Sequence, residues 1–349
     1  MSAGLRLALV CLVLLSSGCA NIGYYLQSVS GQFDIWWRER PIGEVIADPA
    51  TPSALKEKLA QVQEIRRFAS AELDLPQSDS YTRYADLERP YVVWNVFAAP
   101  EFSMRPLQWC FPFVGCVSYR GYFSREEAER FAASLAAVEN DVFVGGIPAY
   151  STLGWFADPV LNTFIHYSDY RIAQLIFHEL AHQKVYARGD SMFNESFAVV
   201  VEQEGVRRWL THHGTAQEKS GYEREQQHRE DFIRLIQAYH GRLTALYESG
   251  LAPEAMRKRK AQTLAEMLRD YEKLKSAWGG YTGYDAWFER RPNNAQIASI
   301  AIYTKLVPGF QALLRQHGGE LPGFYAAVKA LAALPKDERT GRLERLSGS

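Results

Sequence analysis

The sequence predicts an α+β protein that is predominantly helical, with a small sheet in its first half and a helical C-terminal half. Segments rich in β-branched and aromatic residues fall between residues 91 and 167. Apolar residues recur at helical spacing in one segment before them and in several after them. The length, 349 residues, suffices for one large domain or two small ones.

The composition is that of an ordinary globular protein, with 47% hydrophobic and 23% charged residues. The formal net charge is −1, which gives no electrostatic basis for binding nucleic acid. Nucleic acid is therefore excluded as an expected partner.

The N-terminus has the layout of an export signal. Arg6 precedes the apolar run Leu7–Leu15, which is too short to span a bilayer. The run ends in Ser16-Ser17-Gly18-Cys19, which resembles a bacterial lipoprotein signal with Cys19 as the lipidated first residue. A plain signal peptide cut nearby is the alternative. We expect residues 1–18 to be removed and residues 19–50 to form a tether.

The first helix is expected at residues 53–73. Its apolar residues recur at helical spacing with Lys and Glu between them: Leu55, Leu59, Val62 and Phe68. Pro76 follows its end, where a helix commonly stops. A second helix is expected at residues 124–138, with Ser124 as its N-cap and Glu127 at the capping-box position.

Extended segments flank this second helix. β-branched and aromatic residues predict strands at residues 91–97, 142–144 and 162–167. Two short extended pieces are expected within residues 108–123. Together they predict a small sheet that precedes the helix described next.

Cys110 and Cys116 are the cysteines that remain after the signal region. In an exported chain an even pair this close is a disulfide candidate. Two reduced, buried cysteines are the alternative. The sequence has no second Cys or His pair near them, which argues against a zinc site there.

The stretch His178-Glu179-Leu180-Ala181-His182 is an H-E-x-x-H pattern within an apolar segment. On a helix, His178 and His182 lie one turn apart on one face, so both imidazoles can reach one ion. Glu179 lies about 100° further round the helix, close enough to hold a water that the metal activates. The alternative is a core helix with two hydrogen-bonded histidines.

Glu195 is the expected third ligand. Gly189 is expected to end the first helix, and Asp190-Ser191 to cap a second. Counted from this turn, His182 and Glu195 stand within roughly 5 Å of the same height if the two helices pair antiparallel. Two histidines, one glutamate and an open fourth position are typical of a catalytic zinc site.

Two other acids on the second helix compete with Glu195. Glu202 lies two turns further on, about 10 Å along the axis, where it would orient a ligating histidine. Glu204 is rotated by about 180° from Glu195 and is expected to face away.

The motif followed by Asn194-Glu195 resembles that of the gluzincin metallopeptidases, whose third ligand lies in an N-E motif on the next helix. The wider chain resembles a bacterial family of predicted zinc aminopeptidases. Three stretches carry this resemblance: residues 113–123, 149–156 and 291–295. The resemblance implies a zincin-like fold, one Zn²⁺ ion and aminopeptidase activity. Endopeptidase action stays open, because Gly145–Ala149 lacks the glutamate with which the best-known gluzincin aminopeptidases bind the substrate amine.

Peptide hydrolysis at such a site needs a proton carrier and a donor to the oxyanion. Glu179 would take a proton from the water and deliver it to the leaving amine. Tyr150 and Tyr303 are candidates for the donor. For both, the alternative is a packed tyrosine with a bonded hydroxyl.

After Glu195 the chain is expected to be almost wholly helical. Amphipathic patterns and turns predict helices around residues 232–246, 264–278, 295–314 and 322–333. Their outer faces are dense in Arg, Lys and Glu, which is typical of a solvated surface. We expect a zincin-like catalytic core at residues 51–214 and a helical region at residues 215–349 that packs on it.

These observations predict a zinc-dependent peptidase, an aminopeptidase by resemblance, that acts on peptides in the periplasm. Its lipid anchor at Cys19 would hold it in the outer membrane, because Ala20 resembles an outer-membrane sorting residue. The alternative is a non-enzymatic envelope lipoprotein that retains the fold as a binding module. Glu179 argues against this alternative, because binding alone needs no general base.

Overall fold

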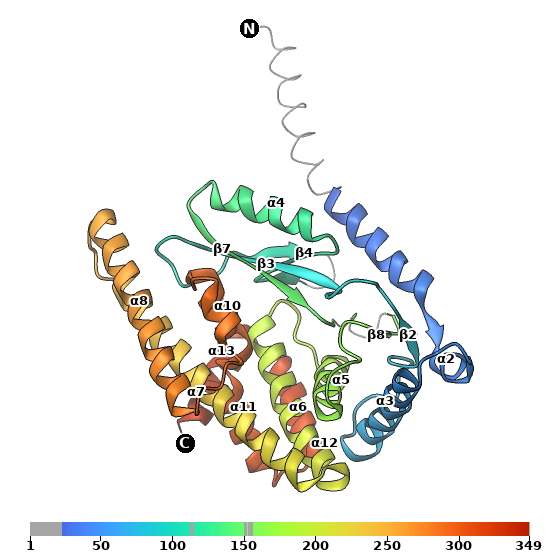
Figure 1. The fold of residues 1–349 in the computed structure, drawn as a ribbon. Coiled ribbons are helices and arrows are strands. Elements are labelled where there is room, and N and C mark those ends of the chain that lie inside the picture. Colours follow the sequence, from blue (N-terminus) through green and yellow to red (C-terminus); the bar gives the residue numbers. More distant parts are fainter. Residues whose placement is uncertain (1–22, 112–114, 150–151, 153–155, 349) are drawn as a thin grey trace, which may run out of the picture.

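The computed structural model describes most of the chain from residue 23 onward. The described residues are 23–111, 115–149, 152 and 156–348. Figure 1 shows a small sheet with one helix on its upper side and most of the helices below it. The fold is α+β and predominantly helical, as the sequence predicts.

The central sheet is antiparallel, and its three strands lie in the order β6 (Arg120–Tyr122), β3 (Val93–Pro100) and β7 (Asn140–Ile147). Successive side chains point to opposite faces, so each face has its own apolar cluster. One face packs against α4 (Arg125–Ala136) and the other against α10 (Asn294–Thr304). The start of α4 is as predicted: Ser124 caps it by accepting a hydrogen bond from the Glu127 N–H at 3.2 Å.

The stretch 19–50, expected to be a tether, is folded over the part that the structure describes. Residues 23–38 form a helix, followed by β1 (Arg40–Pro41) and α2 (Ile42–Ala47). Three apolar residues from these elements are buried: Ile35, Ile42 and Val45. The helix at residues 23–38 has apolar side chains on its inward and outward sides, so it lacks the amphipathic period by which a helix is recognised.

A second small sheet holds β1 against β2 (Arg83–Ala85), which pairs in parallel with β8 (Val160–Leu161). The strand predicted at residues 162–167 is wrong, because this segment is a series of turns. The side chain of Asn162 accepts a hydrogen bond from the Leu87 N–H at 2.8 Å, which holds the first turn. The residues that follow are buried in succession rather than alternately: Thr163, Phe164 and Ile165. They join the core as a compact turn, which accounts for their apolar character.

A short hairpin pairs two strands, β4 (Trp109–Phe111) and β5 (Gly115–Val117). Cys110 and Cys116 lie directly opposite each other in this hairpin and form a disulfide. Gly115 has a φ of +88°, and a Cβ added there would lie 2.8 Å from the backbone nitrogen of Gly189. The hairpin therefore packs closely on the turn before α6, at a position that only glycine fits.

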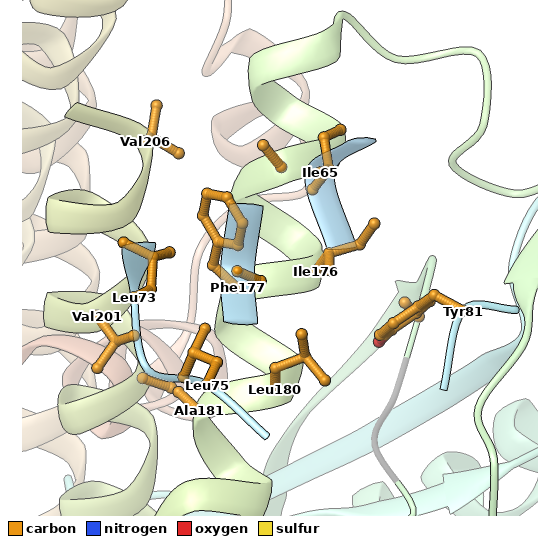
Figure 2. Packing of buried hydrophobic residues seen from close by; sticks show 14 of the residues in the cluster. Ile65, Leu73, Leu75, Tyr81, Ile176, Phe177, Leu180, Ala181, Val201 and Val206 are labelled. Carbon is orange, nitrogen blue, oxygen red and sulfur yellow. The ribbon is translucent and has the colours of Figure 1, made fainter. Parts of the chain in front are cut away.

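The main core surrounds three helices, α3 (Ser53–Glu72), α5 (Asp169–Lys184) and α6 (Ser191–His213). Figure 2 shows the apolar face of α5 between Ile65 of α3 and Val201 and Val206 of α6. Four α5 residues form that face: Ile176, Phe177, Leu180 and Ala181. This packing fixes the position of the helix that carries H-E-x-x-H.

The C-terminal half consists of helices, several of them as predicted. They are α7 (Ala216–Tyr247), α8 (Pro253–Ala277), α9 (Asp285–Glu289), α10, α11 (Val307–Gln316), α12 (Leu321–Ala332) and α13 (Lys336–Ser347). The single helix expected at residues 295–314 is divided into α10 and α11, because Pro308 lacks the N–H that would bond to the carbonyl of Thr304. Helix α13 was not predicted, because its buried residues are only Arg339 and Leu343.

The main core includes residues from both ends of the chain, from Ile35 to Leu343. Among the described residues, one helical stretch, Asn294–Gln316, has the length and apolar composition of a membrane span. More than half of its apolar window is buried inside the protein, as in a core helix. This stretch is the α10–α11 pair, which packs against α6.

Candidate metal centre

Helices α5 and α6 bring together two histidines and a glutamate. His178 and His182 come from α5 and Glu195 from α6, and their ligand atoms all lie within 4.8 Å of one another. Oε2 of Glu195 lies 3.2 Å from Nε2 of His178 and 3.7 Å from Nε2 of His182. The three residues are 9%, 7% and 9% exposed in the order His178, His182, Glu195. This buried group can hold a metal ion, and it is the group that the sequence predicts.

The turn between the two helices is held by side chains of α6. The Asn194 amide accepts a hydrogen bond from the Ala187 N–H at 2.7 Å and donates one to the Ala187 carbonyl at 2.9 Å. Asp190 caps α6, as predicted, by accepting from the Phe193 N–H at 3.3 Å. Helix α5 ends at Lys184 rather than beside Gly189, because the backbone becomes extended at Val185. The side chain of Asn194 then binds the backbone of Ala187.

Glu202 lies behind His178, on the side away from Glu195. Its Oε2 is 2.7 Å from Nδ1 of His178, and its Oε1 accepts hydrogen bonds from Gln174 at 2.8 Å and Arg229 at 2.9 Å. These contacts fix the ring of His178 with Nε2 directed at Glu195. Glu202 thus takes the orienting position predicted for it.

Glu204 and Nδ1 of His182 are two further polar groups near the site. Glu204 faces away, as predicted, and pairs with Arg207 and Arg208 at 2.7 Å. Nδ1 of His182 is buried and has no hydrogen-bond partner among the described residues. Among the described residues the two histidines therefore differ, because Nδ1 of His178 contacts the Glu202 carboxylate and Nδ1 of His182 has no such partner.

The electrostatics keep an anionic carboxylate beside the two imidazoles. Although burial acts to raise it, the pKa of Glu195 is lowered to about 2 by His182 and His178. Burial acts to lower the pKa of His178, but hydrogen bonds to Glu195 and Glu202 raise it well above its ordinary value. Burial raises the pKa of Glu179, against the pull of both histidines. Two imidazole nitrogens converging on a carboxylate form a donor set that suits a divalent cation.

A cavity of about 690 Å³ opens on this group. His178, Glu179, His182 and Glu195 line one part of it. Its walls are largely apolar and come from distant parts of the chain, including Tyr24, Phe111, Val117, Tyr119, Ile147, Leu175, Tyr186 and Tyr303. The cavity is thus large enough for amino-acid side chains beside the metal group.

The tyrosines of the cavity were only partly foreseen. Tyr303 lines the cavity, whereas Tyr150 lies outside the described residues. Tyr119 and Tyr186 also line it, and neither was predicted to be a site residue. Tyr119 lies within a stretch that carries the family resemblance, and Tyr186 lies four residues after His182, so both had a signal in the sequence.

A second cavity, of about 400 Å³, reaches the same group from another side. It shares Leu175, His178 and Glu179 with the first cavity. Its remaining walls are polar and charged, with Arg171, Gln174, Glu202, Glu225, Arg229 and Tyr284 among them. Glu179 therefore lies where an apolar cavity and a charged cavity meet.

A protein-family model described as "Putative aminopeptidase" matches residues 23–343. The chain belongs to this family. No curated protein and no solved structure matches it. The matched range includes the whole His178–Glu195 segment and the residues that line both cavities, so the family match covers the candidate metal centre.

Two other predicted residue sets of this aminopeptidase-family member are not part of the His178, His182 and Glu195 group. The disulfide of Cys110 and Cys116 lies in the hairpin beside the turn before α6, and Phe111 of that hairpin lines the larger cavity. Cys19 precedes the family match and lies outside the described residues.

Proposed function

We propose that this protein is a zinc-dependent aminopeptidase. The observation that carries the proposal is the convergence of His178, His182 and Glu195 within 4.8 Å, with Glu179 lining the same cavity. A nitrogen-rich set with one carboxylate favours zinc over magnesium or calcium, which prefer oxygen ligands. The family name supports a peptide as the substrate.

Zinc would be held by Nε2 of both histidines and by a carboxylate oxygen of Glu195. When bound, the ion would supply Lewis acidity that activates a water and polarises the scissile carbonyl. Glu202 would keep His178 in the tautomer that presents Nε2 to the ion.

Glu179 is the proton carrier of the proposed reaction. Its burial raises the pKa of its carboxyl, which brings this pKa closer to neutrality and suits both the uptake and the return of a proton. It lies where the two cavities meet, so it can take a proton from the attacking water and return it to the leaving amine. It is not part of the ligand group, so its loss would leave the ligands intact.

Tyr119 and Tyr303 are the proposed hydrogen-bond donors to the developing oxyanion. Burial raises the pKa values of Tyr119 and Tyr303, so both phenols stay protonated at neutral pH and can donate hydrogen bonds. Both side chains line the cavity with the metal group. Tyr303 therefore keeps the role proposed from the sequence, and Tyr119 joins it as a candidate.

An aminopeptidase also needs an acid to bind the free amine of the substrate. The acids that line the charged cavity are Glu179, Glu202 and Glu225. Glu179 is assigned to proton transfer, and Glu202 is buried and holds Nδ1 of His178. Glu225 is left, with a side chain 32% exposed and hydrogen bonds from Tyr170 and Arg171. We infer that Glu225 binds the α-amine of the substrate.

The proposed location in the cell rests on the sequence. The apolar run Leu7–Leu15 and Cys19 support a lipid-anchored protein of the outer membrane that faces the periplasm. The disulfide of Cys110 and Cys116 supports an oxidising compartment.

Peptide turnover by the purified, zinc-loaded protein tests the proposed function. The parent protein should release amino acids from unblocked peptides, and Glu179→Gln should retain zinc but lose turnover. Zinc binding by both proteins without turnover by the parent would favour the alternative, a non-enzymatic envelope lipoprotein that acts as a binding module.

A further inference from the structure

The helix at residues 23–38 exposes an apolar stripe along its outer side. Leu26 is 65% exposed, Val29 53%, Phe33 58% and Trp37 92%. Their spacing of three, four and four residues places them on one face of the helix. More than half of the large apolar side chains that are exposed in the described part of the chain lie on this one helix.

The inner side of the same helix is bound to the catalytic domain. Tyr24 and Ser28 line the larger cavity, and the guanidinium of Arg120 lies 3.9 Å from the centre of the Tyr24 ring. The Gln27 side chain accepts a hydrogen bond from the Phe123 N–H at 3.0 Å. These contacts fix which face points outward, so the stripe cannot be buried by rotation of the helix.

The outer face has the chemistry of a membrane-surface helix. Residues 23–33 include no charged residue, and the two charges further on, Asp34 and Arg38, pair with each other at 2.9 Å. Aromatic side chains such as Phe33 and Trp37 favour the boundary between lipid headgroups and acyl chains. An apolar stripe of this extent is rare on a soluble monomer unless it binds something.

We propose that residues 23–38 lie in the surface plane of a lipid bilayer, with the stripe of Leu26, Val29, Phe33 and Trp37 inserted among the lipids. The chain that precedes the helix indicates that the stripe contacts a lipid bilayer. Cys19, the expected site of lipid attachment, lies four residues before residue 23, and four residues span at most about 14 Å. A lipid on Cys19 would therefore hold this end of the helix at the bilayer surface.

The proposal gives the helix two functions, because its inner side forms a wall of the cavity. Tyr24 would lie between the membrane surface and the metal group. Substrates would then reach the cavity from the bilayer surface, which favours peptides that adsorb to lipid. Binding of the helix to lipid does not depend on the reaction, so the proposal stands apart from the peptidase assignment.

Vesicle binding by the chain from Ala20 onward tests the proposal. This chain contains every described residue and lacks Leu7–Leu15 and Cys19, so any lipid binding must come from the folded part. The probe is vesicles of phosphatidylethanolamine and phosphatidylglycerol, separated by sedimentation. The parent chain should bind, and Phe33→Ser combined with Trp37→Ser should lower its partition coefficient about ten-fold or more.

A matched control replaces exposed apolar residues elsewhere. Val138 and Leu251 are 68% and 43% exposed, and Val138→Ser combined with Leu251→Ser should bind vesicles like the parent. Equal losses in both double variants, or no binding by the parent, would overturn the proposal. A parent dimer that the Phe33 and Trp37 changes dissociate, without vesicle binding, would also overturn it and identify the stripe as a contact between two copies.

A second measurement does not depend on the folding of the serine variants. Brominated lipids quench tryptophan fluorescence at short range, so they should quench the vesicle-bound parent. Trp37→Phe keeps the stripe apolar and should bind equally well with much less quenching. Unchanged quenching in Trp37→Phe would show that Trp37 does not enter the bilayer and would overturn the proposal.

Discussion

Nδ1 of His178 lies 2.7 Å from Oε2 of Glu202, while Nε2 of the same ring lies 3.2 Å from Oε2 of Glu195. Two carboxylates that lie two turns apart on α6 therefore hold opposite edges of one imidazole. Only Glu195 also faces His182, at 3.7 Å. The geometry gives one glutamate the position of a ligand and the other the position of a support.

Substitutions at these two glutamates should have unequal effects on metal binding. Glu202→Ala removes the support of His178 and should weaken zinc binding about 10- to 100-fold. Glu195→Ala removes a ligand and should weaken it further. Isothermal titration with zinc would measure both affinities.

Glu204→Ala is the control for this comparison, because Glu204 shares α6 but pairs with Arg207 and Arg208 away from the cavities. Its zinc affinity should match that of the parent. An unchanged affinity in Glu195→Ala, together with a loss in Glu202→Ala, would reverse the assigned roles.

Substitution of Glu225 should affect substrates according to their N-terminus. Glu225→Gln removes the charge proposed to bind the α-amine and should lower kcat/KM for unblocked peptides about 10- to 100-fold, as expected for a lost charged hydrogen bond. N-acetylated peptides should be hydrolysed far more slowly than unblocked peptides by both proteins, because they lack the amine that Glu225 would bind. Glu223→Gln, at an exposed position on the same helix, is the control. A preference of the parent for acetylated peptides would instead show an endopeptidase.

The disulfide should contribute measurably to stability. Replacing both Cys110 and Cys116 by Ser opens a short loop and should lower the free energy of unfolding by about 2 kcal/mol. Denaturant unfolding with and without a reducing agent would measure this, and reduction should bring the parent to the stability of the variant. Rapid thiol labelling of both residues in unreduced, unfolded parent would contradict the bridge.

Replacing two helical glycines by alanine should change the stability of the protein in opposite directions. A Cβ at Gly205 of α6 would lie 2.6 Å from the Phe177 ring and 2.8 Å from Leu73, so Gly205→Ala should destabilise by about 1–3 kcal/mol. Gly241 of α7 has no atom within 4 Å of an added Cβ, so Gly241→Ala should stabilise by up to about 1 kcal/mol. Thermal unfolding of both variants would test whether α5 and α6 pack as closely as described.

Cys19→Ser should abolish lipid attachment and leave the folded domain intact. The motivation is the apolar run that ends in Ser-Ser-Gly-Cys. Metabolic labelling with a fatty acid would report the lipid, and unchanged labelling in the variant would reject Cys19 as the site.

The group of His178, His182 and Glu195 could be predicted because the sequence patterns that indicate it are local. The spacing within H-E-x-x-H, the cap at Asp190 and the helical count to Glu195 all lie within one helix–turn–helix segment. The end of α5 was predicted five residues too late, because the side chain of Asn194 binds the backbone of Ala187 across the turn. Such a contact has no periodic signal in the sequence.

The cavity walls could not be predicted in the same way. Tyr24, Tyr119 and Tyr303 line one cavity only because the N-terminal helix contacts β6 and α10 packs on the sheet. Residues 162–167 were mistaken for a strand because buried turns and buried strands have the same apolar composition. In both cases the missing information is tertiary packing.

The distance along the chain between cavity residues has a consequence for folding. Glu195 follows His178 by only 17 residues (195 − 178), whereas Tyr303 follows Tyr24 by 279 (303 − 24). Closing a long loop costs more entropy than closing a short one, so contacts between distant residues form later. The ion site can therefore assemble before the pocket that selects what reaches it. A newly made chain would acquire its chemistry before its selectivity.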